Sequence, residues 1–542
     1  MRNNIIEQYQ NNAYGVHAEN PTFVREMKTV KSYYDFYEGR PEYQLDDTIE
    51  GEFLEKVGQL WEVDKEDYTP TREVRNLTKQ LIDKQARFMF GLAPTILMKP
   101  FKPADKDLAE GKRTLIEQIF DDIDFWASVS TAFKDSTIGK RVLMMVIVSP
   151  NNVERPLGVR FYTMPEFTYV MNPQDITKLL KVQIVYQDES TIGQIAERQI
   201  WYRYTYEMRD KYTIDEQGQQ VPSASCWCKY ERINGNNVIL KDIVKGEDEQ
   251  GQVMDLEVEA VSEWDTLLDE IPARVIFNGG LTGDINGKSD VKDLIDMANS
   301  YNQTNSDFKD AIKFKMFEQP VFIDADDESV AGIKIAPNVA INLKTDPAIG
   351  TGTESQRAAT VTSLGSTFNF QPAVDSYLDR LKKDMYEFMD QPLPEQLKEV
   401  PSGKALGFLF YDLMGRCDNK YTTTWSPAIK WLIKFMCKCI SKFRLYPEQN
   451  GFAYAECSTN IIIQPNYRIP KDEEVVKDIA IKEVQANVKS HKTYIREFGN
   501  VEDEELEWTE LMEEMDELNN SNNTGLMDIN GEEPPFMSEG EE

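Results

Sequence analysis

Apolar residues recur with a helical period in three segments near the start of the chain, at 71–90, 108–120 and 125–139. Apolar positions spaced three and four residues apart are typical of a helix with one buried face. The first segment is followed by Gly91 and Pro94, residue types that commonly end a helix. The chain is therefore predicted to begin with a helical region.

The period then changes to that of a sheet. Residues 141–149 form a continuous apolar run of strand length. Apolar and polar residues alternate over 159–171 and 180–186. The polar segment 245–252 is predicted to be an exposed turn. Further strand-like segments lie at 200–206, 225–233, 238–243 and 274–278.

Two helical patterns follow, separated by a region of short strands. The first covers 289–318, with Ser289 as its N-cap and Pro320 just beyond its end. Residues 319–371 hold short apolar segments between Pro, Gly, Asp and Thr, which indicates a small strand-and-loop insertion. The second helix is predicted at 373–389.

A third long helical pattern runs from residue 402 to about residue 444. Pro427 lies in its middle, and a proline inside a helix removes a backbone hydrogen bond and clashes with the preceding turn. The pattern allows either one kinked helix or two helices with a break at 424–426. Beyond it we predict a strand at 460–464 and helices at 471–487 and 491–518.

The charge balance argues against a conventional nucleic-acid-binding protein. The 542 residues include 93 acidic and 60 basic ones, a formal net charge of −33. Nucleic-acid binders present a basic face, because Lys and Arg neutralise phosphates, so we expect any contact with DNA to be non-adhesive. Residues 501–542 hold sixteen acidic and no basic residues. Residues 519–542 are predicted to be a disordered, solvated acidic tail.

Cysteine and histidine usage argues against a metal site. The two histidines lie far from the two closely spaced cysteine pairs, and each pair has one intervening residue where zinc ligands usually have two to four. The six cysteines are therefore interpreted as reduced apolar residues, with no metal or cofactor. No apolar run reaches the ~18 residues that span a bilayer, and the N-terminus lacks a signal-peptide core. A soluble protein, neither secreted nor membrane-spanning, is expected.

Gly287-Lys288-Ser289 lies between a predicted strand and a predicted helix, as the end of a phosphate-binding loop does. Such a loop needs another glycine five positions before its Gly-Lys, so that backbone N–H groups surround the phosphates, and Thr282 occupies that place. The structural alternative is that the glycines turn the chain and Ser289 caps the helix. Because the sequence also lacks a Gly-x-Ser-x-Gly elbow and a catalytic histidine context, we expect no enzyme.

The order of these elements resembles that of bacteriophage portal proteins, specifically the branch of siphophages of Gram-positive hosts. The resemblance spans about 30–515 and implies an α+β, mostly helical fold, with wing, stem, clip and crown regions assembled into a ring of about twelve subunits. The segments that carry it are Lys31–Arg40 (KSYYDFYEGR), 76–94, 159–170, 289–310, 402–406 and 408–413.

The resemblance assigns a region to each part of the chain. The regions are the wing 1–288 with an insertion at 189–265, the first stem helix 289–318, the clip 319–372, the second stem helix 373–390, the tunnel loop 391–401, the long kinked helix 402–444, the strand returning to the wing within 445–470, the crown helices 471–518 and the tail 519–542.

The tunnel loop would line the narrowest part of a DNA channel. An acidic wall repels phosphates over a Debye length, about 8 Å at physiological salt, and so lowers friction. On the preceding helix, Lys382 and Lys383 either form a limited basic ring or pair with neighbouring acids such as Asp379 or Asp384. The candidate loop residues are Leu393, Glu395, Gln396, Leu397, Lys398, Glu399 and Val400.

The implied role is a conduit in the virion, at a capsid vertex and assembled in the host cytoplasm. The implied partners are other copies of the chain, double-stranded DNA passing non-specifically, terminase, scaffold or major capsid protein, and a head-completion adaptor. Two alternatives stay open: another minor head protein of the virion, or a nucleotide-dependent enzyme built around Gly287-Lys288-Ser289.

Overall fold

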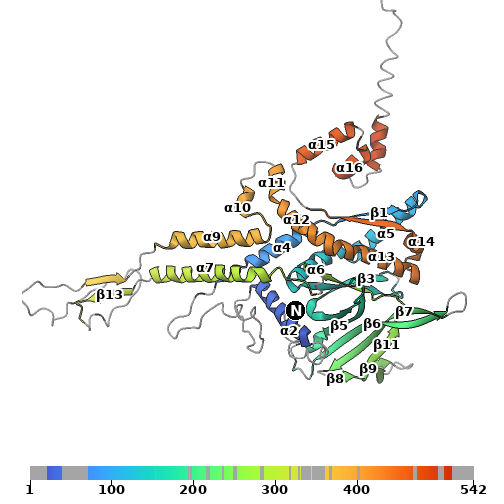
Figure 1. The fold of residues 1–542 in the computed structure, drawn as a ribbon, viewed down its shortest axis with the longest axis horizontal. Coiled ribbons are helices and arrows are strands. Elements are labelled where there is room, and N and C mark those ends of the chain that lie inside the picture. Colours follow the sequence, from blue (N-terminus) through green and yellow to red (C-terminus); the bar gives the residue numbers. More distant parts are fainter. Residues whose placement is uncertain are drawn as a thin grey trace, which may run out of the picture. The chain divides into compact units, whose positions relative to one another are not determined.

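The chain has an α+β fold, as predicted, and divides into two compact units (Figure 1). One unit comprises Met1–Leu393 with Asp412–Arg468, and the other Pro394–Tyr411 with Ile469–Glu542. The computed structural model describes residues 21–39, 71, 73–152, 154–192, 194–195, 198–214, 220–234, 237–247, 253–280, 286–316, 319–326, 330, 344, 360–364, 369–398, 403–467, 473–486, 488–498 and 506–515.

The described part of the first unit opens with the helices α2 (Pro21–Glu38), α4 (Leu77–Phe90), α5 (Lys106–Asp122) and α6 (Phe125–Gly139). Gly111 allows α5 to approach the helix α14 (Gly451–Glu456), because a Cβ there would lie 2.4 Å from the ring of Tyr454. The predicted helices at 108–120 and 125–139 are confirmed.

The predicted helix at 71–90 begins only at Leu77. Asn76 is its N-cap, and the Asn76 Oδ1 accepts a hydrogen bond of 3.0 Å from the backbone N–H of Lys79. Before the cap, Thr71, Glu73 and Arg75 lie outside any helix, and their backbone N–H groups bond to side chains of a distant helix instead. The prediction was wrong for these residues, since local periodicity does not reveal a tertiary partner.

The described strands form five sheets, and three of these contain most of the strands. β12 (Ala273–Phe277), β2 (Arg141–Val148) and β3 (Leu157–Thr163) pair antiparallel, and their faces are largely buried. β1 (Thr95–Pro100) pairs antiparallel with β15 (Thr459–Gln464), with Thr95 opposite Gln464. The strand predicted at 460–464 therefore returns to the first part of the chain. The third sheet is larger.

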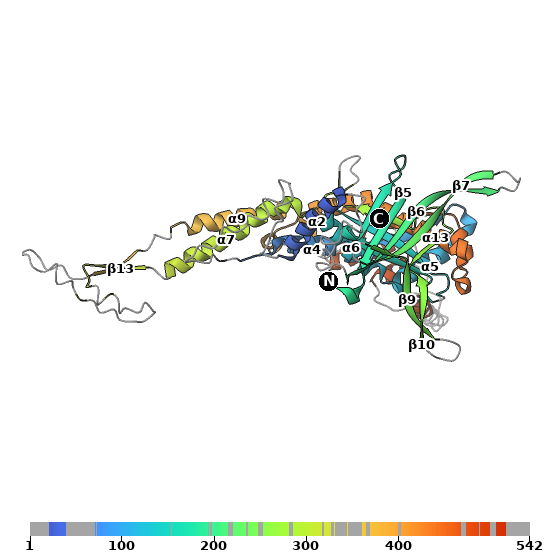
Figure 2. The ribbon, with the colours of Figure 1, turned by 90° about the horizontal axis from the view of Figure 1, so that it is seen from below.

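The largest sheet has the order β11–β7–β6–β5–β4, with β8 also paired to β7. Its outer members are β11 (Val261–Asp265), β8 (Asn237–Ile239) and β4 (Phe167–Met171), and β5 spans Leu179–Gln187. The predicted insertion at 189–265 contributes β8, β11 and the long strands β6 (Ile200–Ile214) and β7 (Gln220–Asn234) to it. Figure 2 shows β5, β6 and β7 side by side.

Two parts of this region differ from the sequence prediction. The alternating segment 159–171 is two strands, because the 3-10 turn η2 (Met164–Glu166) separates β3 from β4. The predicted polar turn 245–252 is partly strand: β9 (Lys241–Glu247) pairs with β10 (Val253–Glu259), and residues 248–252 lie outside the described residues. Residues 245–247 show no alternation of apolar and polar side chains, so the sequence did not predict a strand there.

Two helices run side by side away from this body (Figures 1 and 2): α7 (Ile295–Met316) and α9 (Gln371–Phe388). The predicted helix at 373–389 is confirmed within two residues. The helix predicted at 289–318 is shorter, since it begins with the 3-10 turn η5 (Lys292–Leu294) and ends at Met316. Pro320 is in the strand β13 (Gln319–Ile323), which pairs with β14 (Thr360–Leu364).

The predicted long helix at 402–444 is interrupted. It consists of α11 (Gly403–Leu409), α12 (Tyr411–Lys420), the π-helical segment η7 (Tyr421–Trp425) and α13 (Ser426–Phe443). Pro427 lies in the first turn of α13 and offers no N–H to the preceding turn. The hydroxyl of Thr423 donates to its own helix, to the carbonyl of Asn419 at 2.7 Å. These two features loosen the α-helical ladder before Pro427.

The core of the first unit joins the helices to the large sheet. α2, α4, the start of α7 and the end of α9 all contribute buried residues, among them Met27, Leu81, Trp201, Val291, Leu294, Met385 and Tyr386. Burial of each large apolar side chain stabilises the fold by about 1.5–3 kcal/mol. The bases of α7 and α9 are therefore fixed in the body.

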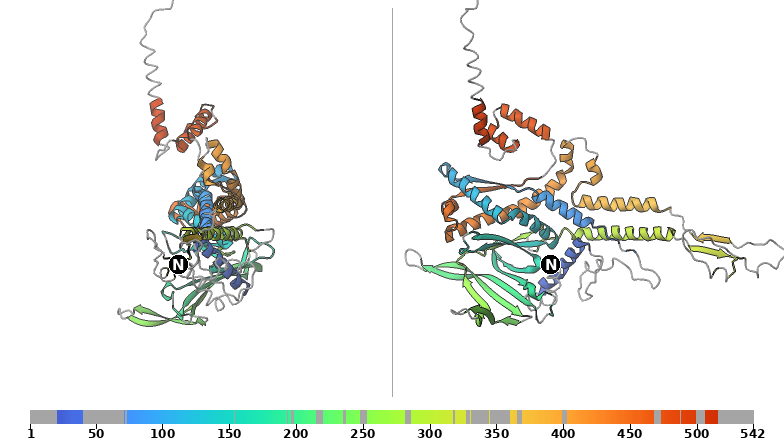
Figure 3. Two further views of the ribbon diagram at one scale, coloured as in Figure 1. Left: turned by 90° about the vertical axis from the view of Figure 1, so that its left-hand side faces the viewer. Right: turned by 180° about the vertical axis from the view of Figure 1, so that it is seen from behind.

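The second unit is helical where it is described. It contains α10 (Pro394–Lys398), α11, α15 (Glu473–Gln485), α16 (His491–Phe498) and a helix over 506–515 (Figure 3). The predicted helix at 491–518 is helical over 491–498 and 506–515, and residues 499–505 lie outside the described residues. Residues 519–542, the predicted acidic tail, lie outside the described residues.

All six cysteines are buried and free, as predicted. Within the described residues, no helix is both long and apolar enough to cross a bilayer. In the same residues, no three or more His, Cys, Asp or Glu side chains gather as metal ligands.

Candidate functional site

Directly after Gly287, backbone N–H groups are bonded within the protein. The N–H of Lys288 donates to the Asn278 carbonyl at 2.8 Å, and the N–H of Asp290 donates to the Thr137 carbonyl at 2.9 Å. The Ser289 hydroxyl accepts from the N–H of Val291 at 3.2 Å, as a capping residue does. Because a phosphate-binding loop needs such groups free, this geometry favours the structural alternative.

Gly287 explains why a glycine is needed in this turn. Its φ is +72°, a backbone conformation that residues other than glycine rarely adopt. An added Cβ would also lie 2.5 Å from the carbonyl oxygen of Lys140. Gly287 therefore allows the backbone of this turn to lie close to the backbone of Lys140.

Lys288→Ala is expected to leave folding, assembly and nucleotide affinity unchanged. The Lys288 side chain is exposed, and its backbone bonds to Asn278 do not depend on the side chain. Circular dichroism and equilibrium binding of ATP to both proteins check this. Tight ATP binding by the parent that is lost in the variant would contradict it.

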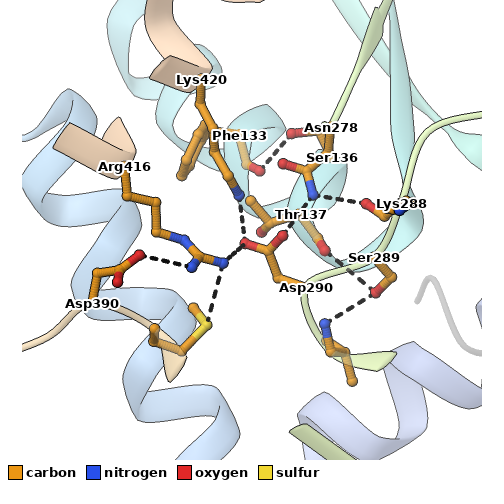
Figure 4. Close-up of polar contacts among 12 residues, drawn as sticks. Phe133, Ser136, Thr137, Asn278, Lys288, Ser289, Asp290, Asp390, Arg416 and Lys420 are labelled. Atoms are coloured by element: carbon orange, nitrogen blue, oxygen red, sulfur yellow. Dashed lines mark hydrogen bonds and ion pairs between the residues drawn. The ribbon is translucent and has the colours of Figure 1, made fainter. Parts of the chain in front are cut away.

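Directly after the turn, Asp290 is the centre of a buried ionic cluster at the base of α7 (Figure 4). Its carboxylate contacts the ammonium of Lys420 and lies 3.4 Å from the guanidinium of Arg416. Arg416 also bonds to Asp390, just after α9, at 3.1 Å. Asn278 donates a hydrogen bond of 2.9 Å to Asp290 from the end of β12. The cluster thus joins both long helices to α12.

The charges in this cluster balance, two carboxylates against two cations. The Asp290 and Lys420 side chains are only 10% and 12% exposed. Burial alone would raise the pKa of Asp290, but the charges of Lys420 and Arg416 outweigh burial and hold the pKa below its ordinary value. Burial lowers the pKa of Lys420, and the charge of Asp290 opposes that effect. Each charge therefore depends on its partners.

A second set of bonds fixes α7 to the segment before α4. Three polar side chains spaced four residues apart on α7 accept from alternate backbone N–H groups of that extended segment. The pairs are Asp310 with Thr71 at 2.7 Å, Ser306 with Glu73 at 3.0 Å and Asn302 with Arg75 at 2.9 Å. These bonds keep Thr71, Glu73 and Arg75 out of the helix that follows.

The start of the predicted tunnel loop is anchored to α4. The Gln391 side-chain amide donates to the Leu81 carbonyl at 2.6 Å, and the Lys84 ammonium donates to the Pro392 carbonyl at 3.1 Å. Leu393 is partly buried against the core cluster. Its predicted contact with DNA stays a prediction.

The prediction of an irregular loop is wrong for 394–398. Residues 394–398 form the short helix α10, because Pro394 suits a first helical position while Glu395 and Lys398 lie at the ends that favour their charges. Glu395, Gln396 and Lys398 are exposed, and Leu397 is half-buried. Glu399 and Val400 lie outside the described residues. No described feature tests the contact of these side chains with DNA.

The two predicted stem lysines lie on α9 and differ in exposure. Lys383 is exposed and pairs with Glu387, one turn away, at 3.4 Å. Lys382 is half-buried. The predicted alternative of pairing with acids is thus realised for Lys383, but with Glu387 rather than with Asp379 or Asp384. The basic ring stays a prediction.

The ionic cluster is not among the sites predicted from the sequence. A partial signal exists: Arg416 and Lys420 are spaced four residues apart, so one face of a predicted helix carries both cations. Their carboxylate partner Asp290 lies 126 and 130 residues away in sequence. Spacing alone could not identify it.

The sequence profile of a known family matches the chain from residue 17 to residue 521, and the family is described as phage portal protein, SPP1 Gp6-like. A comparison with curated proteins gives no match. The profile covers the body, α7, α9 and the helices that follow, and confirms the resemblance at the level of the family. Portal proteins are virion proteins of the bacteriophage head–tail connector that take part in genome packaging. The chain belongs to the SPP1 Gp6-like phage portal protein family.

Proposed function

We propose that the chain is the subunit of a closed ring of about twelve copies, whose central channel passes double-stranded DNA into and out of the capsid. The observation that carries the proposal is the family match over residues 17–521. The role is structural rather than enzymatic. The N–H groups of Lys288 and Asp290 support this, because both are bonded within the protein rather than free for a phosphate.

In this proposal α7 and α9 are the stem and the channel wall is non-adhesive. The sequence of α9 holds four acidic and three basic residues, so the helix offers no continuous basic face to phosphates. The chain as a whole carries −33, which disfavours tight binding of a polyanion. DNA would therefore pass along the stem with little attraction.

The remaining regions are assigned on the family resemblance. Residues 1–288 with the returning strand form the wing, 319–372 the clip that meets the head-completion adaptor, and 471–518 the crown. Terminase docks during packaging, and scaffold or major capsid protein surrounds the ring during assembly in the host cytoplasm. The narrower placement among siphophages of Gram-positive hosts rests on the sequence resemblance.

Electron microscopy of the purified full chain, with mass measured by light scattering, tests the ring. We expect closed rings with a central hole and about twelve copies. The protein should be studied alone and after co-expression with the capsid and scaffold proteins. A protein that stays monomeric in both preparations would contradict the proposal and favour a different minor head protein.

A further inference from the structure

A basic cavity lies in the body, away from the stem. It has a volume of about 550 Å³ and is formed by α5, α13, α14 and the start of β15. Four lysines and one carboxylate line it: Lys112, Lys434, Lys438, Lys442 and Glu456. Such a concentration of cations is unusual on a chain with a net charge of −33.

The helix α13 supplies most of this charge. Its sequence, SPAIKWLIKFMCKCISKF, contains no acidic residue, and its four lysines are spaced four residues apart. Lys434, Lys438 and Lys442 line the cavity, whereas Lys430, one turn earlier, does not. The spacing places the three cavity lysines along neighbouring turns of one side of the helix.

The lysines differ in their partners. Lys438 pairs with Asp269 at 2.5 Å and Glu270 at 3.5 Å. Lys434 is exposed and has no ion pair among the described residues. Lys442 donates to the carbonyl of Leu267. The cavity therefore offers cationic groups that the surrounding carboxylates do not fully neutralise.

Lys112 points most clearly to a ligand. It is only 7% exposed, and its ammonium donates to the carbonyls of Cys457 at 2.9 Å and Ala455 at 3.4 Å. Neither partner carries a charge. Burial of an ammonium group without a counter-charge is unfavourable, so an anion in the cavity would stabilise the site.

The cavity also has an apolar side. Phe101 lies at its edge and is 72% exposed, and Ile461 and Cys437 line the wall. A free phosphate would satisfy the lysines and leave Phe101 in water. The phosphates of a DNA duplex would contact the lysines and, like a free phosphate, leave Phe101 without an apolar partner. A peptide that carries both carboxylates and an apolar side chain covers both sides.

We infer that this cavity binds an acidic peptide segment of a partner protein, with carboxylates on the lysines and an apolar side chain against Phe101. The cavity volume lies within the range of specific ligand sites, about 300–1,000 Å³. Charge complementarity supplies orientation and association rate, and the apolar contact supplies affinity. The inference does not depend on the proposed DNA channel.

The test uses the full chain and a labelled peptide of Glu and Asp residues with one central leucine. We expect saturable binding by fluorescence anisotropy, weakened as salt concentration rises. Lys434→Glu should weaken binding about tenfold, because it replaces an attraction by a repulsion. Lys430→Glu is the matched control, with the same charge change on the same helix outside the cavity, and should change binding less than about twofold.

A second variant tests the apolar contact. Phe101→Ala should weaken binding of the leucine peptide and leave binding of a peptide with serine in place of leucine unchanged. Circular dichroism checks that each variant folds. Absence of peptide binding, an equal effect of Lys430→Glu, or stronger competition by inorganic phosphate or by a DNA duplex than by unlabelled peptide would each overturn the inference.

Discussion

Asp290→Asn is expected to lower the free energy of unfolding of the first unit by about 3–5 kcal/mol. The substitution keeps the size of the side chain and leaves an acceptor for Asn278, but it removes the charge that faces Lys420 and Arg416. Arg416 retains Asp390, whereas Lys420 loses its carboxylate partner while remaining buried. An uncompensated buried charge makes the effect large.

Hydrogen exchange of the α12 backbone amides, with urea unfolding of the same samples, measures this effect. Exchange should become faster on the order of a hundred- to a thousand-fold, since about 1.4 kcal/mol corresponds to a factor of ten. Asp390→Asn is the matched control. Its side chain is 42% exposed, so a loss of about 0–1 kcal/mol is expected. Equal effects of the two substitutions would show that the buried cluster has no special role.

The effect of Asp290→Asn should depend on pH. The pKa of Asp290 in the folded protein lies below its ordinary value of 3.8, so the carboxylate stabilises the fold above that value. This stabilisation is lost as the pH falls through the folded pKa. The stability difference between parent and variant should therefore be full near neutral pH and shrink below about pH 4. A difference that stays constant on acidification would contradict an electrostatic origin.

Local periodicity predicted the elements whose apolar residues recur at a regular spacing along the chain. α9, α5 and α6 were found within two residues because each has one apolar face, and β2 because it is a continuous apolar run. The family could be named from the order of such elements. These features follow from spacing along the chain, which the sequence displays directly.

The remaining features depend on contacts between distant segments. Residues 71–76 have a helical pattern, yet alternate N–H groups of this segment, at 71, 73 and 75, bond to Asp310, Ser306 and Asn302 on α7. The π segment before Pro427 holds Trp425 against Phe90 and Phe133, at ring distances of 5.3 and 5.9 Å. Pro427 signalled an irregular helix, but only this aromatic packing shows where the extra residue is accommodated.

The local structure of the tunnel loop was also only partly predictable from the sequence. Its prolines suggested an irregular segment, and the charges that favour α10 were interpreted only as a repulsive wall. Both can hold, because a helix of five residues still leaves Glu395 exposed.

Replacing Glu395 and Glu399 together by lysine is expected to reduce packaged genomes by about tenfold or more without preventing ring formation. Each subunit would place two ammonium groups where it had two carboxylates, so the channel would attract the phosphates that it is proposed to repel. Quantitative PCR of nuclease-protected DNA measures packaging, and electron microscopy of the purified variant measures assembly.

The matched control changes the same net charge on the exposed surface of α5, by Glu110→Lys with Glu117→Lys. These residues pair with Arg113 outside the predicted loop, so rings and packaging should stay close to the parent. Normal packaging in the loop variant would remove the proposed role of these two glutamates. Equal impairment in both variants would assign the defect to net charge rather than to position. Loss of packaging in the loop variant alone, with intact rings, would locate the DNA-facing surface at this short segment. The two variants carry the same change in net charge and both assemble, so only the position of the substitutions differs.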